Sequence, residues 1–260
     1  KEAAYFAFPF RLGASSKRAA FVEQPYGVMQ VERDQAPGGC RDWYTTNSFA
    51  AVSDGRYTAY LATPHAPLLT FNDIFRGRMR EHVDPINGAV FPYVLNNYWG
   101  TNYKASQGGH LVFSFALRLE RGGFDPVKAT QFGWDALSTM ADPGAGDAAD
   151  LWIRTARPAV PAGPSMAPEA STIRVSSAKG LVGGITCRHG RLVVRLYNPT
   201  AEPTAAAVEV PGRQISEAWL ADLVGEPRAR LPLAGTGHTA RVQVPRRGLA
   251  TVVLSLGDGP

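Results

Sequence analysis

The run from Phe91 to His110 reads FPYVLNNYWGTNYKASQGGH and combines side-chain amides with aromatic rings. Aromatic faces stack on the C–H side of a sugar ring, and amides offer both donors and acceptors to neighbouring hydroxyls. This mixture predicts a carbohydrate-facing loop, with Asn97, Trp99, Asn102 and Tyr103 as the candidate contacts. Asn, Gly and Tyr also gather at strand ends for structural reasons, and Trp99 could pack in a core. Composition alone favours this structural alternative.

The order of residues within this run carries more information than its composition. An Asn-Asn-x-Trp-x-Thr-Asn-Tyr core is followed by a Gln and a Gly, and it resembles the signature of the C-terminal β-domain of glycoside hydrolase family 38, the retaining α-mannosidases. The matching residues are Asn96, Asn97, Trp99, Thr101, Asn102, Tyr103, Gln107 and Gly108. Segments 5–10, 63–68 and 195–200 also have family counterparts, so the resemblance covers nearly the whole chain. The family often has an Arg-Tyr pair where this chain has Phe113-Ser114-Phe115, so no role for that Arg carries over.

The resemblance implies a role for the chain beside a catalytic domain. In this family the nucleophile and the zinc ligands lie in an N-terminal catalytic domain. The resemblance of this chain is to the C-terminal β-domain and does not include that catalytic domain. We therefore expect no catalytic residue, no metal ligand and no cofactor in this chain, and expect zinc in the catalytic domain of the parent enzyme. The expected partners are that domain and mannose-containing carbohydrate. The alternatives are an autonomous carbohydrate-binding module, or a purely structural sandwich that mediates homo-oligomer contacts.

The remaining reactive side chains give no independent catalytic motif. His65, His82, His110, His189 and His238 are dispersed, without the HxH or HExxH spacing that starts a metal site. The sequence 73–84 holds two Asp residues, one Glu and one His, which is the nearest acid and base cluster to the signature. Charged loop residues are usually solvated, so we interpret this cluster as structural.

Composition describes an ordinary globular protein, with 45% hydrophobic and 19% charged residues. No apolar run reaches the roughly 18 residues of a membrane span, so we expect no membrane partner, and the first residues do not resemble a signal peptide. These features fix no compartment, but Cys40 and Cys187 are too few for a disulfide framework, so the default expectation is a cytoplasmic protein. The excess of Arg over Lys, with abundant Ala and Gly, suggests a bacterial origin.

The net charge of +5 could indicate a polyanion partner. The positive residues are scattered and no nucleic-acid motif is present, so we expect no nucleic acid partner. Arg76, Arg78 and Arg80 alternate along one segment, which we interpret as a solvated sheet edge.

The hydrophobic pattern predicts an all-β fold with one short helix. Short alternating runs recur between turn residues, and the run from Leu111 to Leu119 predicts a strand with its Leu and Phe residues on a buried face. Asp125 and Pro126 predict the start of a helix over 126–138, although Gly133 weakens the pattern.

A Pro and Ala-rich stretch, 156–170, separates two series of strands and predicts a linker. The expected domains are therefore 1–155 and 171–260. The resemblance implies that the first is half of a galactose-mutarotase-like super-sandwich, and strand spacing predicts a small immunoglobulin-like sandwich for the second. In that larger fold, further strands come before the strand that corresponds to Tyr5. Without those strands, one face or edge of a sheet in this chain would be exposed. Either the half is self-sufficient or the chain forms a homo-oligomer.

Overall fold

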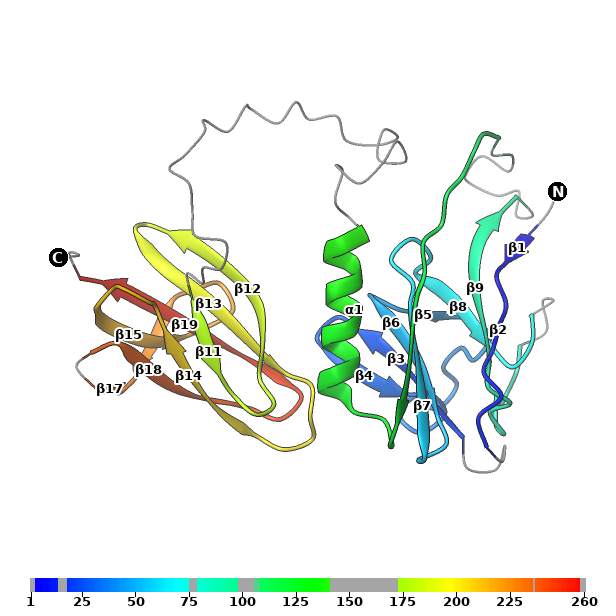
Figure 1. The fold of residues 1–260 in the computed structure, drawn as a ribbon, viewed down its shortest axis with the longest axis horizontal. Coiled ribbons are helices and arrows are strands. Elements are labelled where there is room, and N and C mark those ends of the chain that lie inside the picture. The colour runs from blue at the N-terminus through cyan, green and yellow to red at the C-terminus, as the bar shows by residue number, and fades with distance from the viewer. Residues whose placement is uncertain are drawn as a thin grey trace. The chain divides into compact units, whose positions relative to one another are not determined.

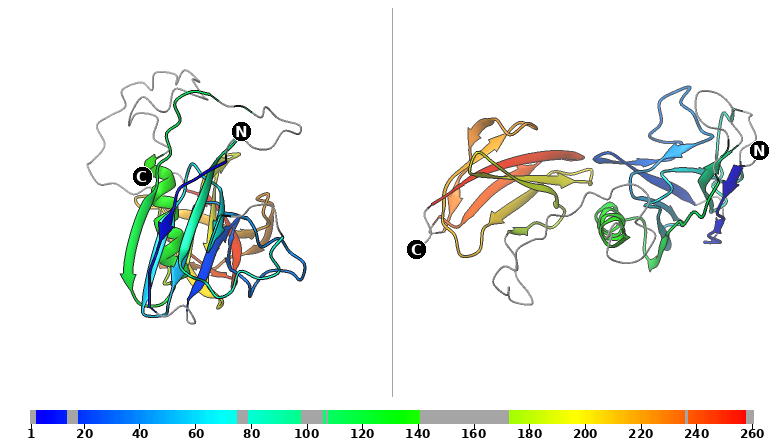
Figure 2. Two further views of the ribbon diagram at one scale, coloured as in Figure 1. Left: turned by 90° about the vertical axis from the view of Figure 1, so that its right-hand side faces the viewer. Right: turned by 90° about the horizontal axis from the view of Figure 1, so that it is seen from above.

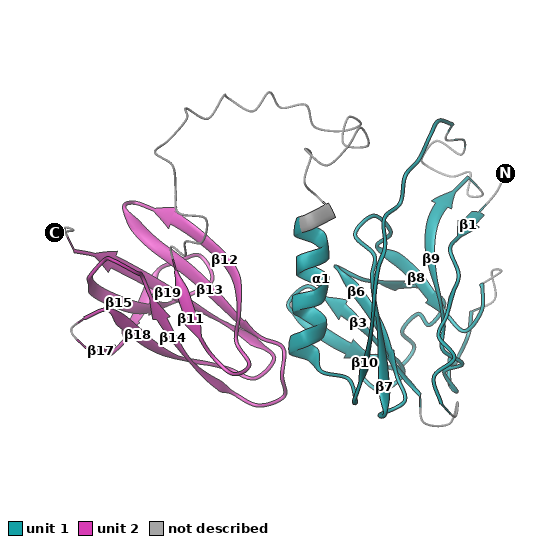
Figure 3. Ribbon diagram, in the orientation of Figure 1, with its two compact units in different colours: residues 1–153 teal, residues 154–260 magenta. Residues whose placement is uncertain are grey.

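The computed structural model describes residues 3–13, 18–74, 79–97, 106, 108–140, 173–235 and 237–257. The chain divides into two compact units, unit 1 (residues 1–153) and unit 2 (residues 154–260), shown in Figure 3. The predicted boundaries 1–155 and 171–260 remain predictions, and the predicted linker 156–170 lies outside the described residues.

Unit 1 contains two antiparallel sheets and one helix (Figure 1). Sheet I has the strand order β1-β9-β8-β5, with β2 also paired to β9, and sheet II has the order β10-β7-β6-β3-β4. The elements are β1 (Ala3–Tyr5), β2 (Phe8–Pro9), β3 (Ala19–Gln24), β4 (Gly27–Gln30), β5 (Tyr44–Thr45), β6 (Phe49–Ser53), β7 (Tyr57–Ala62), β8 (Leu68–Phe71), β9 (Ala89–Asn96), β10 (Ala116–Arg121) and α1 (Pro126–Met140).

The core of unit 1 lies between the two sheets. Alternation places one side of each strand in this core, because successive side chains point to opposite faces. Residues from both sheets form one buried cluster, including Val22 and Leu61 of sheet II and Leu69, Phe71 and Val90 of sheet I. The two sheets therefore form a β-sandwich.

Helix α1 covers the other face of sheet II, as the two views of Figure 2 show. Phe49, Tyr60 and Ala129 are buried together in this second cluster. Asp125 caps the helix: its Oδ1 accepts from the N–H groups of Val127 (2.9 Å) and Lys128 (3.3 Å), as the sequence predicted. The observed helix is two residues longer than predicted at its C-terminal end.

Gly133 has a packing role within α1. A Cβ at this position would overlap Ser48 Oγ and would lie 3.1 Å from Phe49 Cδ1. The glycine that weakened the helical pattern therefore lets the helix approach the sheet closely.

Strand β10 corrects the predicted strand at 111–119. The strand begins at Ala116, and Leu117 and Leu119 are 57% and 67% exposed instead of buried. Both lie on the core side of sheet II, because their cross-strand partners are the buried Leu61 and Ala59. β10 is at the edge of sheet II, and the exposure of its leucines shows that the core side of the sandwich is left open there.

Unit 2 is a second sandwich of two antiparallel sheets. Sheet III has the order β11-β14-β18-β17, and sheet IV has the order β12-β13-β19-β15-β16. The strands are β11 (Arg174–Ser176), β12 (Leu181–Arg188), β13 (Arg191–Asn198), β14 (Thr204–Glu209), β15 (Ile215–Ala221), β16 (Pro227–Arg230), β17 (Leu233–Ala234), β18 (Thr239–Val244) and β19 (Gly248–Leu256). Their inner faces share one apolar core that includes Leu196, Val208, Val242 and Val252.

The described residues therefore confirm a mostly β protein with two sandwiches and one helix. None of the helices in the described part of the chain is long and apolar enough to span a membrane.

Candidate functional site

The signature run begins on β9, which pairs with β1 at one edge of sheet I. β9 ends at Asn96, and Asn97 follows it directly. Of the four predicted contacts, Asn97 is the one that the structure describes. Trp99, Asn102 and Tyr103 lie outside the described residues, so their predicted sugar contacts remain predictions.

Asn97 is partly buried, and its Oδ1 atom is fully buried without a hydrogen-bond partner among the described residues. A buried carbonyl oxygen of this kind costs roughly 1–3 kcal/mol when it is left without a donor. A polar group on a ligand is one means of supplying that donor. The sugar contact predicted for Asn97 remains a prediction.

Three aromatic side chains lie together on sheet I before Asn97. The Tyr5 and Tyr93 rings are stacked, with centroids 4.4 Å apart and planes 7° from parallel. Trp43 Nε1 donates to Tyr5 Oη at 3.4 Å. The β1–β9 register places Tyr5 opposite Tyr93, so strand pairing itself creates the stack. All three side chains are partly exposed.

Sequence reasoning included Tyr93 in the signature run but missed Tyr5 and Trp43 as its neighbours. Trp43 precedes β5, on the far side of sheet I from β1, and about fifty residues separate it from Tyr93. No local pattern indicates such a contact. The sequence placed Tyr5 in a predicted strand and gave no reason to include it in the site.

The Phe113-Ser114-Phe115 departure from the family pattern serves packing. The Phe115 ring lies 5.2 Å from Phe6 and 5.1 Å from Phe8, and Phe113 lies 6.2 Å from Phe6, all between ring centroids. These rings join the start of the chain to the segment that leads into β10.

Two members of the acid and base cluster at 73–84 bind different partners. Asp73 Oδ1 accepts from the backbone N–H of Ile74 at 2.7 Å, whereas His82 Nδ1 lies 3.2 Å from Glu32 Oε2. Burial raises the pKa of Glu32, but hydrogen bonds from the Val83 N–H, His82 and Arg41 outweigh it and lower the pKa below its usual value. This carboxylate fastens a loop, which supports the structural interpretation of the cluster.

Arg80 corrects the prediction of a solvated arginine edge, while Arg76 and Arg78 lie outside the described residues. Its guanidinium donates to Phe71 O (3.0 Å) and Thr70 Oγ1 (2.7 Å), and forms an ion pair with the buried Asp42 (3.3 Å). Arg80 therefore anchors the segment after β8 to sheet I.

One carboxyl group lies deep inside unit 1. Glu23 is 1% exposed and accepts hydrogen bonds from Ser48 Oγ and from Trp134 Nε1, the latter at 2.9 Å. Burial raises the pKa of Glu23, and these hydrogen bonds only partly oppose that rise. A raised pKa suits a general acid. However, Glu23 is enclosed beneath α1, where a substrate does not reach it.

Metal-binding geometry is missing from the described ranges: no three His, Cys, Asp or Glu side chains converge there. These residues therefore do not fit a zinc site.

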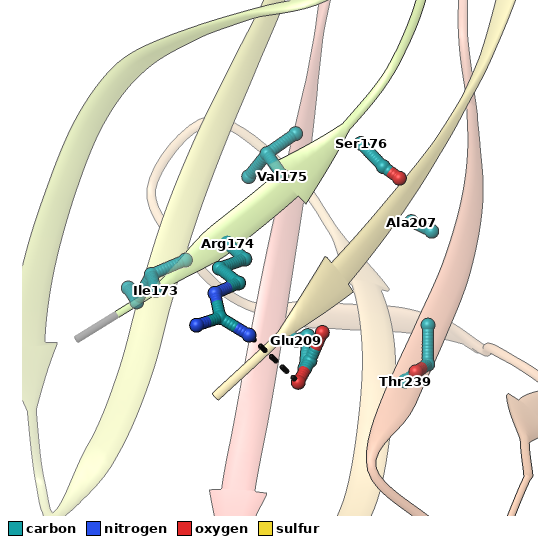
Figure 4. Close-up of a pocket in the computed structure, with 7 residues that line it drawn as sticks. All are labelled: Ile173, Arg174, Val175, Ser176, Ala207, Glu209 and Thr239. Carbon is teal, nitrogen blue, oxygen red and sulfur yellow. Dashed lines mark ion pairs between the residues drawn. The ribbon is translucent and has the colours of Figure 1, made fainter. Parts of the chain in front are cut away.

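The hollows in unit 2 lie on different elements from the signature. One hollow of about 610 Å³ lies over β11 and β14 (Figure 4). Its polar side chains include Arg174 and Glu209, whose charged atoms are 3.9 Å apart. Both are substantially exposed, so this is a solvated ion pair of small energetic value.

A solved α-mannosidase from Enterococcus faecalis V583 has a similar fold. The match covers 97% of this chain with a TM-score of 0.62 and 11% sequence identity. The chain spans only 26% of that protein's length. This agrees with the resemblance of the signature run to an α-mannosidase β-region, and at this identity it shows the fold alone. No protein-family model matches the chain, and no curated protein matches its sequence.

Proposed function

We propose that this chain is the non-catalytic β-region of an α-mannosidase-like glycoside hydrolase and supports a catalytic domain outside the 260 residues. The fold match to one quarter of an α-mannosidase is the observation that carries the proposal. In this proposal unit 1 is half of a galactose-mutarotase-like super-sandwich, and unit 2 is the small immunoglobulin-like sandwich.

The open side of β10 supports a scaffolding role. Leu117 and Leu119 expose most of their surface although they continue the apolar core side of sheet II. Among the described strands β10 pairs only with β7, so its other edge keeps unpaired backbone groups. An exposed apolar edge strand is a site for adding another strand. We propose that a segment of the catalytic portion covers it.

The chemistry of the proposed enzyme would then come from that portion. Retaining glycoside hydrolysis needs two carboxyl groups about 5–5.5 Å apart across the scissile bond. We propose that this pair and the zinc ligands lie outside this chain. The purified chain is expected to show no hydrolysis of an aryl α-mannoside above the buffer rate. Turnover that purifies with the chain and disappears with a substitution of Asp73 or Asp84 would overturn the proposal.

Association provides a positive test. The separately expressed catalytic portion should co-purify with the chain, and the double substitution Leu117→Ser and Leu119→Ser should abolish this association. The matched control is Leu223→Ser, because Leu223 is similarly exposed but lies in unit 2. If the parent chain, the double variant and the Leu223→Ser variant associated equally well with the catalytic portion, β10 would not be the docking edge.

A second candidate is an autonomous carbohydrate-binding module. The partly exposed rings of Tyr5, Trp43 and Tyr93 favour it, as does Asn97 Oδ1, which has no hydrogen-bond partner in the part of the chain that the structure describes. Intrinsic fluorescence titrated with mannose and short α-mannosides tests this candidate. Saturable binding that is lost in Asn97→Ala and Trp99→Ala would support it, whereas an unchanged signal up to millimolar sugar would exclude it.

A further inference from the structure

The hairpin between β12 and β13 places two arginines directly opposite each other. Arg188 pairs with Arg191, and His189 and Gly190 form the two-residue turn between them with φ values of 50° and 72°. Side chains of directly opposed residues start about 5 Å apart, and like charges in this arrangement are destabilising. Positive φ at both turn positions is typical of the two-residue turns that join paired strands. Conflicts such as this like-charge pair within a well-paired sheet often mark functional positions.

A hollow of about 290 Å³ lies beside this arginine pair. The buried side chains of Val193 and Val253 line it, together with Arg188, Arg191, His189 and Glu226. The hollow thus combines an apolar lining with cationic groups.

Two arginines hold the loop between β15 and β16 at this hollow. Arg188 Nη1 donates to Val224 O at 2.7 Å, and Arg195 Nη2 donates to Leu223 O at 3.2 Å. Both acceptors are backbone carbonyl oxygens, so these hydrogen bonds hold the loop in place but do not neutralise the charges of Arg188 and Arg195. Arg191 forms no ion pair or side-chain hydrogen bond with the described residues.

The acids on neighbouring elements do not neutralise the pair. Asp222 is engaged by Arg228 at 2.7 Å, and Glu217 faces Arg230 at 3.4 Å. Glu226 is the acid that lines the hollow. It lines the hollow together with Arg188 and Arg191, so the cationic side chains outnumber the anionic one.

We propose that this hollow binds a single oxyanion, either a carboxylate or a phosphate, as a free anion or as a substituent of a sugar. Arg191 and the unused donors of Arg188 bind the oxygens, and the guanidinium fork matches both groups. The bound anion also removes the repulsion between the paired arginines. This site lies in unit 2 and does not depend on the proposed α-mannosidase-like function.

The test is a titration of the full 260-residue chain with inorganic phosphate at constant ionic strength, followed by the backbone NMR shifts of residues 188–191 and 222–226. Saturable shifts are expected at these positions. Arg191→Gln should weaken binding about tenfold, as expected for loss of a charge-assisted bidentate contact. Arg246→Gln is the matched control, because it removes the same charge from an exposed position in the loop between β18 and β19. Equal shifts in both variants, or shifts spread over all exposed arginines, would overturn the proposal.

A stability measurement keeps the test valid if a variant perturbs the hairpin. Arg191→Glu replaces the like-charge pair by an opposite-charge pair, so it should raise Tm without phosphate and abolish the rise in Tm that phosphate causes in the parent chain. A phosphate-induced rise that persists in Arg191→Glu would contradict the site. Parallel titrations with glucuronate and with a sugar phosphate identify which source of the oxyanion binds more tightly, and failure of all three probes would overturn the proposal.

Discussion

The two units finish their sheets differently, as edge strands β10 and β16 show. Every residue of β16 is exposed, and this strand consists of Pro227, Arg228, Ala229 and Arg230. Proline lacks an N–H donor, and charged side chains oppose the addition of another strand. β10 instead exposes Leu117 and Leu119 at its edge. Unit 2 therefore protects this edge from association, whereas unit 1 leaves an edge suited to a partner.

Sheet II itself contains a second contrast. Its outer face is completed within the chain by α1, which packs on Phe49 and Tyr60. Its core-side face is completed by sheet I except beneath β10. Unit 1 therefore covers the outer face of sheet II with its own helix but leaves the core-side face of sheet II exposed at β10.

Neighbouring leucines on β7 and β10 give the sharpest test of this difference. Leu61→Ala should destabilise the chain by about 4 kcal/mol, because the side chain is fully buried and its loss leaves a cavity. Leu117→Ala, at the cross-strand partner, should change stability by less than about 0.5 kcal/mol. Urea unfolding measures both, and similar losses would show that β10 is covered within this chain.

The Arg80 anchor is expected to have the next largest effect. Arg80→Gln should cost about 3 kcal/mol, because it leaves Asp42 buried without its cation. Arg33→Gln is the control, since Arg33 is exposed and its pair with Asp34 should contribute no more than about 0.5 kcal/mol. Thermal unfolding of the two variants compares them, and equal Tm values would contradict the role of Arg80.

The close contact of α1 with sheet II predicts a smaller loss. Gly133→Ala should destabilise unit 1 by about 2 kcal/mol, because the added methyl group overlaps Ser48 and crowds Phe49. At Gly184 in β12 an added Cβ meets nothing within 4 Å, so Gly184→Ala serves as the matched substitution in unit 2. A Gly133→Ala protein as stable as the Gly184→Ala protein would show that α1 is less tightly packed than described.

Glu23 predicts a pH-dependent difference of smaller size. Its pKa is raised from 4.5 by burial, so the folded state binds the proton more tightly than the unfolded state. This contribution is fully present below about pH 4.5 and is lost as pH rises through the folded-state pKa. Glu23→Gln should therefore be less sensitive to rising pH than the parent chain. Denaturant midpoints measured from pH 4 to pH 8 test this, and parallel profiles would contradict it.

The sequence predicted the fold class and the helix because these depend on local signals. Asp125 and Pro126 mark the helix start, and regular alternation marks most strands. It missed β3 and β12 and the short strands β5, β16 and β17. In β12 the Gly183-Gly184 pair resembles a turn. The exposure of Leu117 and Leu119 could not be predicted, because alternation identifies which residues share a face but not whether another sheet covers it.

The site was predictable only in part for the same reason. The signature run identified Asn97 by its order of residues. The contact between Trp43 and Tyr5 depends on pairing between distant strands, and the opposed arginines at Arg188 and Arg191 become apparent only from the hairpin register.

Amide hydrogen exchange of β10 and β16 tests the central claim most directly. It would be measured for the chain alone and after addition of the separately expressed catalytic portion. If β10 is the docking edge, its outward amides will exchange at least about tenfold more slowly in the mixture, as expected when an open edge becomes hydrogen-bonded, while β16 will not change. Unchanged exchange at β10 in a mixture that is demonstrably associated would contradict the account.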